Sequence, residues 1–275
     1  MMQSLLFEQI KRKKSFLCVG LDVDHDRIPL DLKDEPDSIF TFCKRIIEAT
    51  APYCVAYKPN IAFFEANGLD GWKSLEKIMD FLNKNYPEIF TIADAKRADI
   101  GNTSEQYAKA YFKQFEFDSV TIAPYMGKDS VEPFLSYEGK HTILLALTSN
   151  EGASDFQLLN SEGIPLYEQV IERSKKWQNA NRLMYVVGAT KAHALKKIRT
   201  LVPDSFLLIP GLGAQGGSLE EVATNGLNDT CGLLVNSSRG IIYASNRSDF
   251  DQAAGKVSRD LQQQMAVYLS QKGII

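Results

Sequence analysis

The sequence predicts a (β/α)₈ TIM barrel, formed as a single domain by residues 1–275 with a short helix at the N-terminus. Eight short apolar segments recur along the chain, and each is followed by a stretch with helical character. The segments are continuous runs of aliphatic and β-branched residues, which is typical of strands that are buried on both faces. Eight such units within about 250 residues fit one barrel domain.

A doubly wound open sheet is the alternative fold with alternating strands and helices. In that fold a glycine-rich phosphate loop normally follows the first strand. Here the first strand ends in Gly20-Leu21-Asp22, whereas the glycine-rich segment 211–217 follows the seventh strand. The position of the glycines therefore favours the barrel.

Each predicted strand is a short apolar run that stops at polar or small residues. The first strand ends at Asp22, and the second ends in Lys58-Pro59-Asn60. The third is followed directly by the charged segment 94–99. In chain order, the strands are predicted at residues 15–21, 54–57, 89–93, 119–123, 142–147, 183–187, 206–209 and 232–235.

The helices are predicted from start signals and from apolar residues spaced three or four positions apart. Pro36-Asp37-Ser38 starts a helix on which Ile39, Phe42 and Ile46 share one face. Residues 151–163 are small and polar, and we expect a loop there. Further helical segments are predicted at residues 1–14, 74–83, 103–115, 165–178 and 249–269, with a short helix after Asp129.

Composition limits the classes of partner. The net charge of −3 provides no basic field for nucleic acid, and no apolar run approaches the roughly 20 residues that span a bilayer. In the N-terminal stretch the basic residues 11–14 follow the apolar ones, which reverses the order of a signal peptide. The four cysteines lack metal-ligand spacing, and three lie in apolar runs, as expected for reduced thiols. We therefore expect a cytoplasmic protein with no nucleic-acid or membrane partner.

The charged segment after the third strand is the first candidate for a functional site. In an extended chain Asp94 and Lys96 point to the same face, and barrel active sites lie at the carboxyl ends of the strands. A structural ion pair would explain one Asp-x-Lys motif, because buried charges are costly unless they are paired. A second carboxylate, Asp99, near the same barrel mouth favours a catalytic role.

Neighbouring strands add further charges to this end of the barrel. Asp22 and Lys58 end the first and second strands, so we expect an array of alternating sign with Asp94 and Lys96. Lysines flanked by carboxylates stay protonated, so Lys96 suits proton donation better than Schiff-base chemistry. The two ammonium groups also disfavour Mg²⁺, and we expect no metal at this site.

A phosphate site is predicted at the ends of the last two strands. The segment 211–217 offers backbone N–H groups that can approach a ligand closely, and Ser237-Ser238-Arg239-Gly240 adds a guanidinium. A glycine-rich loop alone is weak evidence, since tight turns also need glycine. Two such loops on neighbouring strands, together with Arg239, favour phosphate binding.

The segment Asp94-Ala95-Lys96-Arg97-Ala98-Asp99-Ile100-Gly101-Asn102-Thr103 resembles the signature of the orotidine 5′-phosphate decarboxylase family, in particular its longer bacterial subgroup. Glu151 departs from the pattern, because proline is expected after Ser149-Asn150. The departure concerns the base-binding loop. The other matching segments are Tyr57-Lys58-Pro59-Asn60, Pro124-Tyr125-Met126-Gly127, Thr148-Ser149-Asn150, Pro210-Gly211-Leu212-Gly213-Ala214-Gln215-Gly216-Gly217 and Ser238-Arg239-Gly240.

The resemblance implies a phosphate-binding barrel that converts orotidine 5′-phosphate to uridine 5′-phosphate in de novo pyrimidine biosynthesis, without a cofactor. Lys96 would protonate carbon 6 of the pyrimidine as carbon dioxide leaves. Asp94 would lie against the departing carboxylate, and Lys58 would position Asp94 and the ribose. A fixed ammonium suits this reaction, because the carbanion left by carbon dioxide has no ring position to delocalise it.

The resemblance also implies the substrate contacts and the assembly. Asp22 would bind a ribose hydroxyl, and Ser149 would bind the pyrimidine amide. Asp99 and Thr103 would reach the active site of a partner subunit, so we expect a homodimer with shared sites. The phosphate would be held by Gln215, Ser238 and Arg239.

Two other functions remain open from the sequence. The first is a related barrel enzyme, a sugar-phosphate decarboxylase or aldolase that uses Mg²⁺ to stabilise an enediolate. Such an enzyme would need a carboxylate at the end of the second strand, where Lys58 stands. The second is a catalytically silent barrel that binds a phosphate ligand as a regulator or scaffold, which would not need all four charged residues intact.

Overall fold

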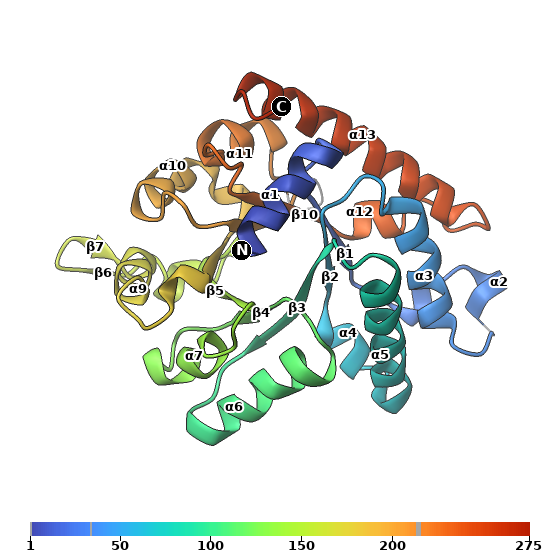
Figure 1. The fold of residues 1–275 in the computed structure, drawn as a ribbon, viewed down its shortest axis with the longest axis horizontal. Helices are drawn as coiled ribbons and strands as arrows, with labels where there is room; N and C mark the ends of the chain where they lie inside the picture. Colours follow the sequence, from blue (N-terminus) through green and yellow to red (C-terminus); the bar gives the residue numbers. More distant parts are fainter. Residues whose placement is uncertain (1, 34, 213–215) are drawn as a thin grey trace.

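Eight parallel strands close into a barrel in the computed structural model of the chain, which describes residues 2–33, 35–212 and 216–275. The helices surround this ring (Figure 1). The ring closes where β10 pairs with β1, with Leu17 opposite Val235. The predicted barrel is therefore confirmed. Its strands are β1 Leu17–Leu21, β2 Ala56–Pro59, β3 Phe90–Arg97, β4 Ser119–Ile122, β5 His141–Leu147, β8 Leu183–Val187, β9 Leu207–Pro210 and β10 Leu233–Ser237.

The barrel strands are apolar because both of their faces are covered. Every residue of β1, β2, β4, β8 and β10 is buried, with the helices on the outer side and side chains filling the inner side. This burial explains why the strands show runs of apolar residues rather than alternation. The helices are α1 Met2–Lys13, α2 Leu30–Lys33, α3 Ser38–Thr50, α4 Ile61–Glu65, α5 Gly68–Asn85, α6 Gly101–Lys109, α7 Lys128–Leu135, α8 Ala153–Phe156, α9 Leu166–Ser174, α10 Ala192–Leu201, α11 Leu219–Gly226, α12 Arg239–Ile242 and α13 Phe250–Gln271.

The N-terminal helix α1 is attached at the amino-terminal side of the strands, away from the predicted site. Lys13 at its end donates hydrogen bonds to the carbonyl oxygens of Ala51 at 2.8 Å and Cys54 at 2.9 Å, just before β2. The carboxyl ends of the strands therefore stay clear of α1. None of the helices in the described ranges is both long and apolar enough to cross a membrane.

The segment 151–163 is more ordered than the predicted loop. It contains α8 and one strand of a small antiparallel hairpin, in which β6 (Asn160–Ser161) pairs with β7 (Ile164–Pro165). Glu162 and Gly163 connect these strands with φ values of 56° and 78°. Two consecutive left-handed residues form the tight turn that suits a two-residue hairpin. The sequence did not predict this hairpin, because Glu162-Gly163 is not one of the favoured turn pairs and strands of two residues are too short to show a periodic pattern.

The cysteine prediction is confirmed for all four residues. Cys18, Cys43, Cys54 and Cys231 are buried and unbridged. Burial raises the pKa of the Cys54 thiol to about 11, partly offset by the nearby ammonium of Lys13. The cysteines are therefore small packing residues rather than reactive groups.

Candidate active site

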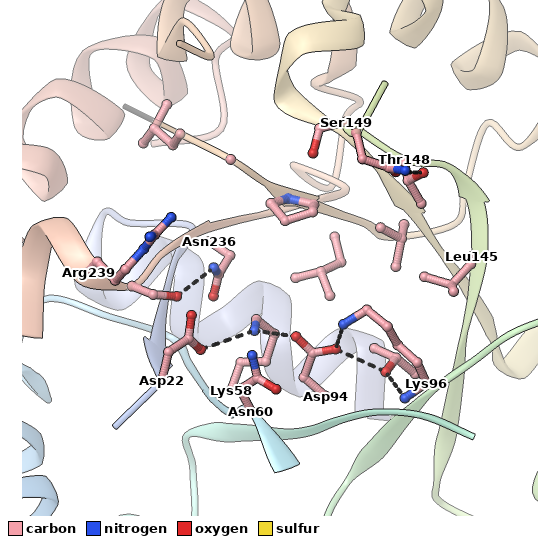
Figure 2. Close-up of a pocket in the computed structure, with 18 residues that line it drawn as sticks. Asp22, Lys58, Asn60, Asp94, Lys96, Leu145, Thr148, Ser149, Asn236 and Arg239 are labelled. Carbon is pink, nitrogen blue, oxygen red and sulfur yellow. Dashed lines mark hydrogen bonds and ion pairs between the residues drawn. The ribbon is translucent and has the colours of Figure 1, made fainter. Parts of the chain in front are cut away.

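A cavity of about 390 Å³ opens at the carboxyl-terminal ends of the barrel strands. Figure 2 shows the side chains that line it, with Arg239 on one side and Lys96 on the other. The apolar side chains of Leu145, Val186 and Leu208 also line it. Seven of the ten predicted site residues border this one cavity: Asp22, Lys58, Asp94, Lys96, Ser149, Ser238 and Arg239.

The three other predicted residues are placed differently. Asp99 and Thr103 do not line the cavity of their own chain. The Asp99 carboxylate accepts a hydrogen bond from the N–H of Ile100 at 2.7 Å, and Thr103 is exposed in the first turn of α6. Gln215 lies outside the described residues. The structure thus brings the predicted catalytic lysines together but leaves Asp99 apart from them.

Three strand ends contribute a chain of opposite charges. Lys58 Nζ lies 2.6 Å from Asp94 Oδ2 and 4.0 Å from Asp22 Oδ1. Lys96 Nζ lies 2.5 Å from the other carboxylate oxygen, Asp94 Oδ1. The side chain of Lys58 is only 4% exposed, whereas that of Lys96 is 52% exposed and faces the cavity. The Asp94 carboxylate is therefore held between a buried and an accessible ammonium group.

The electrostatics keep this chain charged. Burial alone would raise the pKa of Asp94, but the positive charges of Lys58 and Lys96 outweigh burial and hold it well below its usual range. Burial alone would lower the pKa of Lys58, but the charges of Asp94 and Asp22 hold it above its usual range. Both residues are therefore ionised at neutral pH. The ammonium of Lys58 also occupies the space in which a cation could bridge the two carboxylates.

A β-bulge, rather than a regular strand, aims Lys96 at Asp94. The pairing of β3 with β4 shifts between Ala93 and Arg97, and Lys96 adopts a left-handed φ of 46°. The prediction assumed an extended chain, in which residues two apart share a face. The predicted proximity of Asp94 and Lys96 is observed, but a left-handed backbone at Lys96, rather than a regular extended strand, brings the two side chains together. A non-glycine residue in this region costs on the order of 1–3 kcal/mol, so its surroundings must hold it.

Thr121 of β4 holds the bulge from inside the barrel. Its hydroxyl oxygen accepts a hydrogen bond from the backbone N–H of Lys96 at 2.9 Å, and the hydroxyl donates to Asp94 Oδ1 at 3.2 Å. A single buried hydroxyl thus connects the strained backbone of Lys96 with the carboxylate that its side chain contacts. Thr121 was not among the predicted site residues, because one threonine in an apolar strand is also common as a packing residue.

Arg97 holds the same bulge from outside the barrel. Its guanidinium donates to the carbonyl oxygen of Ala95 at 3.0 Å and forms an ion pair with Glu65 of α4. The guanidinium carbon also lies 5.5 Å from the ring centre of Tyr107 and 5.9 Å from that of Tyr111. Strong contacts on both sides of β3 therefore fix the backbone around Lys96.

The residues that are predicted to bind phosphate lie on the opposite side of the cavity. Arg239 begins α12 directly after Ser238, and both line the cavity. The backbone N–H of Gly217 donates to the carbonyl oxygen of Gly211 at 3.3 Å, so the two ends of the glycine-rich segment lie close together. Gly211 has a φ of 99°, a conformation that other residues rarely adopt. The groups needed for an anion site are therefore gathered opposite Lys96.

The loop after β5 supplies Ser149 to a third side of the cavity (Figure 2). A Cβ atom on Gly188 would lie 2.7 Å from the backbone nitrogen of Ser149, so this loop rests on the end of β8. Gln157 braces the loop by accepting a hydrogen bond from the N–H of Thr148 at 2.8 Å. Glu151, the departure from the family pattern, is exposed and does not line the cavity.

Comparisons with known proteins decide the family. The model of the orotidine 5′-phosphate decarboxylase / HUMPS family matches residues 15–252. The chain belongs to this family. Orotidine 5′-phosphate decarboxylase of Flavobacterium johnsoniae is 62% identical over 97% of this chain and 98% of the relative. The same enzyme of Christiangramia forsetii is 62% identical over 95% of this chain and 96% of the relative.

The solved structures of the family agree with the barrel. The structure of Leishmania donovani OMP decarboxylase matches with a TM-score of 0.81 and 36% sequence identity. The match covers 97% of this chain and 99% of the Leishmania chain. The similarity therefore extends over nearly the whole length of both chains.

Removing the Thr121 hydroxyl should impair turnover more than binding. We expect Thr121→Val to lower kcat for orotidine 5′-phosphate by on the order of 10- to 100-fold, because small misplacements of catalytic groups have effects of this size. The dissociation constant of uridine 5′-phosphate should change little. Steady-state kinetics and calorimetry measure these two quantities.

Thr121→Ser is the matched control, because it keeps the hydroxyl and loses only a methyl group. We expect it to retain most of the wild-type kcat. Wild-type turnover in Thr121→Val, or equal losses in the valine and serine variants, would show that the hydroxyl does not position Lys96 and Asp94.

Proposed function

We propose that Lys96 is the proton donor in this chain's reaction, the decarboxylation of orotidine 5′-phosphate to uridine 5′-phosphate in pyrimidine synthesis. The reaction itself follows from the family and from relatives that are 62% identical. One observation carries the assignment of Lys96: its ammonium lies 2.5 Å from a buried carboxylate and faces the cavity. An ammonium held in this way is positioned before the substrate arrives.

The proposed step is a direct exchange of carbon dioxide for a proton. The bond between carbon 6 and the carboxylate breaks, and its electron pair stays on carbon 6. Lys96 gives a proton to this carbon and is left as a neutral amine, which regains a proton from water. No electron acceptor is required, because the pair that leaves the carboxylate forms the new C–H bond. The step therefore needs no cofactor in our proposal.

Asp94 and Lys58 would prepare Lys96 for this step. Asp94 fixes the ammonium by a direct contact, and Lys58 compensates the carboxylate from its buried side. The negative charge of Asp94 would lie near the substrate carboxylate and would favour its departure as neutral carbon dioxide. Because the positive charge remains beside carbon 6, the arrangement stabilises the carbanion more than the substrate.

The remaining cavity residues would orient the nucleotide. A phosphate at Ser238 and Arg239 and a base near Lys96 would span the cavity from one side to the other. Ser149 would bind the pyrimidine amide from the third side, and Asp22 would bind a ribose hydroxyl. Gln215 would be an additional phosphate contact. Phosphate binding is remote from carbon 6, so its energy can organise the site for the chemical step.

We also propose a homodimer with shared active sites. Asp99 and Thr103 do not line the cavity of their own chain, although both belong to the segment that resembles the family signature. Asp99 follows the bulge that places Lys96, and α6 starts two residues later. In a two-fold dimer both residues could complete the partner's site, and the contribution would be reciprocal. We propose further that the chain acts as a single domain in the cytoplasm.

The magnesium alternative is disfavoured by the residue at the end of β2. A metal-dependent enzyme of this barrel type would need a carboxylate there, whereas Lys58 donates a 2.6 Å hydrogen bond to Asp94 at that position. A silent phosphate-binding barrel would have no use for a buried carboxylate held between two ammonium groups. The charged array therefore supports catalysis over both alternatives.

The variant Lys96→Ala tests the proton donor. We expect it to lose more than the roughly 2.7–4 kcal/mol of transition-state stabilisation that one electrostatic donor supplies, because cation and proton disappear together. The loss in kcat should exceed about 1,000-fold. Binding of uridine 5′-phosphate, measured by calorimetry, should persist.

Lys73→Ala is the matched control, because Lys73 is an exposed lysine on α5 that pairs with Asp70. It should keep wild-type turnover and nucleotide binding. A Lys96→Ala enzyme that retains a tenth of the wild-type kcat would refute the assignment of the proton donor.

Mixed dimers test the sharing of active sites. Lys96→Ala and Asp99→Ala proteins, each nearly inactive alone, should regain activity after they are unfolded and refolded together. In a mixed dimer one site loses both residues and the other keeps both. With equal amounts and random pairing, half of the dimers are mixed, so about a quarter of the wild-type activity should return.

The same experiment excludes an unshared site. If Asp99 served its own chain, every site would carry one substitution and mixing would restore nothing. The control is a mixture refolded separately and combined afterwards, in which stable dimers do not exchange subunits and activity should stay low.

A further inference from the structure

Asn236 is a buried polar residue of the cavity to which neither the sequence motifs nor the proposed reaction assigns a role. It lies near the end of β10, where it pairs with Cys18 of β1. Only 6% of its surface is exposed, yet it lines the cavity. Its Nδ2 donates a hydrogen bond to the Ser238 hydroxyl at 3.1 Å. Its Oδ1 is buried and has no hydrogen-bond partner among the described residues.

Asp22 presents a second acceptor of the same kind. Its Oδ1 is buried without a hydrogen-bond partner in the described part of the chain. The ammonium of Lys58 lies 4.0 Å from this oxygen, which is too long for a hydrogen bond. A buried acceptor without a donor costs about 1–3 kcal/mol, so two of them at one cavity require an explanation.

The packing at Gly20 places the Asn236 amide beside the strand that carries Asp22. A Cβ atom at Gly20 would lie 1.8 Å from Ser238 Oγ and 3.1 Å from Asn236 Oδ1. Ser238 and Asn236 therefore contact the bare backbone of β1 at a position where no side chain fits. Asp22 lies two residues further along the same chain, towards the cavity mouth. Figure 2 shows Asn236 and Asp22 between Arg239 and Lys58.

The chemistry of this pair selects the kind of ligand group that it can bind. Two acceptor oxygens can be satisfied by hydroxyl groups, by water or by a cation. The ammonium of Lys58 disfavours a cation next to Asp22. The hydrogen bond from Nδ2 to Ser238 fixes the amide so that its oxygen remains the free acceptor. A sugar with neighbouring hydroxyl groups supplies two donors at once.

We propose that Asn236 binds a ribose hydroxyl of the nucleotide and acts with Asp22 to select ribonucleotides. The inference rests on the proposed function, because a nucleotide with its phosphate at Arg239 and its base near Lys96 must place its sugar between them. Asn236 lies on β10 and Asp22 directly follows the adjacent strand β1, and both line the cavity. Asn236 is thus a specificity-determining residue rather than a participant in proton transfer.

Binding of deoxynucleotides tests this inference. The dissociation constants of uridine 5′-phosphate and of its 2′-deoxy and 3′-deoxy analogues are measured for the wild type and for Asn236→Leu, which keeps the volume without polar atoms. We expect Asn236→Leu to raise the dissociation constant of uridine 5′-phosphate by roughly 3- to 30-fold, which is the effect of losing one hydrogen bond. For one of the two deoxy analogues, variant and wild type should bind almost equally, because that analogue lacks the hydroxyl that Asn236 binds.

Two further variants keep the result interpretable. Thermal unfolding shows whether the leucine variant folds normally. If it does not, Asn236→Ala replaces it in the binding experiment and should give the same pattern. Asn225→Leu is the matched control on α11, where the Asn225 amide donates to the carbonyl oxygen of Glu221 at 2.8 Å and Asn225 does not line the cavity. It should bind all three nucleotides as the wild type does.

The outcomes separate this inference from the proposed function. If Asn236→Leu weakened the binding of all three nucleotides equally, or of none of them, Asn236 would not bind a ribose hydroxyl. The binding of uridine, which lacks the phosphate, tests the orientation independently. If the wild type bound uridine as tightly as uridine 5′-phosphate, the proposed placement of the nucleotide would fail and the inference with it.

Discussion

The contact of the Asp94 carboxylate with two ammonium groups is the interaction on which the rest of this site depends. Lys58 approaches one carboxylate oxygen at 2.6 Å and Lys96 approaches the other at 2.5 Å. A carboxylate buried within β3, as that of Asp94 is, would be costly alone, and so would the buried ammonium of Lys58. Each compensates the other, which leaves Lys96 as the partner that is exposed to the cavity. The positive charge is thus held in place by the fold rather than by the substrate.

This arrangement needs a departure from regular β-structure, and the barrel provides the supports for it. The left-handed backbone of Lys96 is held by the Thr121 hydroxyl on the inner side and by Arg97 with Glu65 on the outer side. Both supports come from elements adjacent to β3, namely β4 and α4. The closed ring also places β1 between β10 and β2, so Asp22, Lys58 and Arg239 line one cavity together with Lys96. Strain at one residue is therefore balanced by rigid neighbours.

The sequence predicted the barrel and seven residues of the cavity lining because both follow from local patterns. Buried parallel strands are apolar throughout, and their carboxyl ends form one surface, so Asp22, Lys58 and Arg239 could be assigned to one site without coordinates. The bulge at Lys96 could not be predicted, because no neighbouring residue in the sequence indicates that a lysine will adopt a left-handed backbone conformation. Thr121 and Asn236 were missed for a related reason: a polar residue in an apolar strand gains meaning only when its partners are known. The position of Asp99 relative to a partner subunit remains a prediction.

The titration of Asp94 tests the central claim most directly. Carboxyl ¹³C chemical shifts of aspartate-labelled protein, with the Asp94 signal assigned by its loss in Asp94→Asn, report its ionisation. We predict that Asp94 remains ionised at about pH 4, where an ordinary aspartate is half protonated, because Lys58 and Lys96 lower its pKa. Because the pKa of Asp94 is lower in the folded than in the unfolded protein, its ionisation stabilises the fold at any pH above the unfolded-state pKa. This stabilisation is lost as the pH falls from the unfolded-state pKa to the folded-state pKa. A titration midpoint at or above pH 4 would contradict a carboxylate held between two ammonium groups.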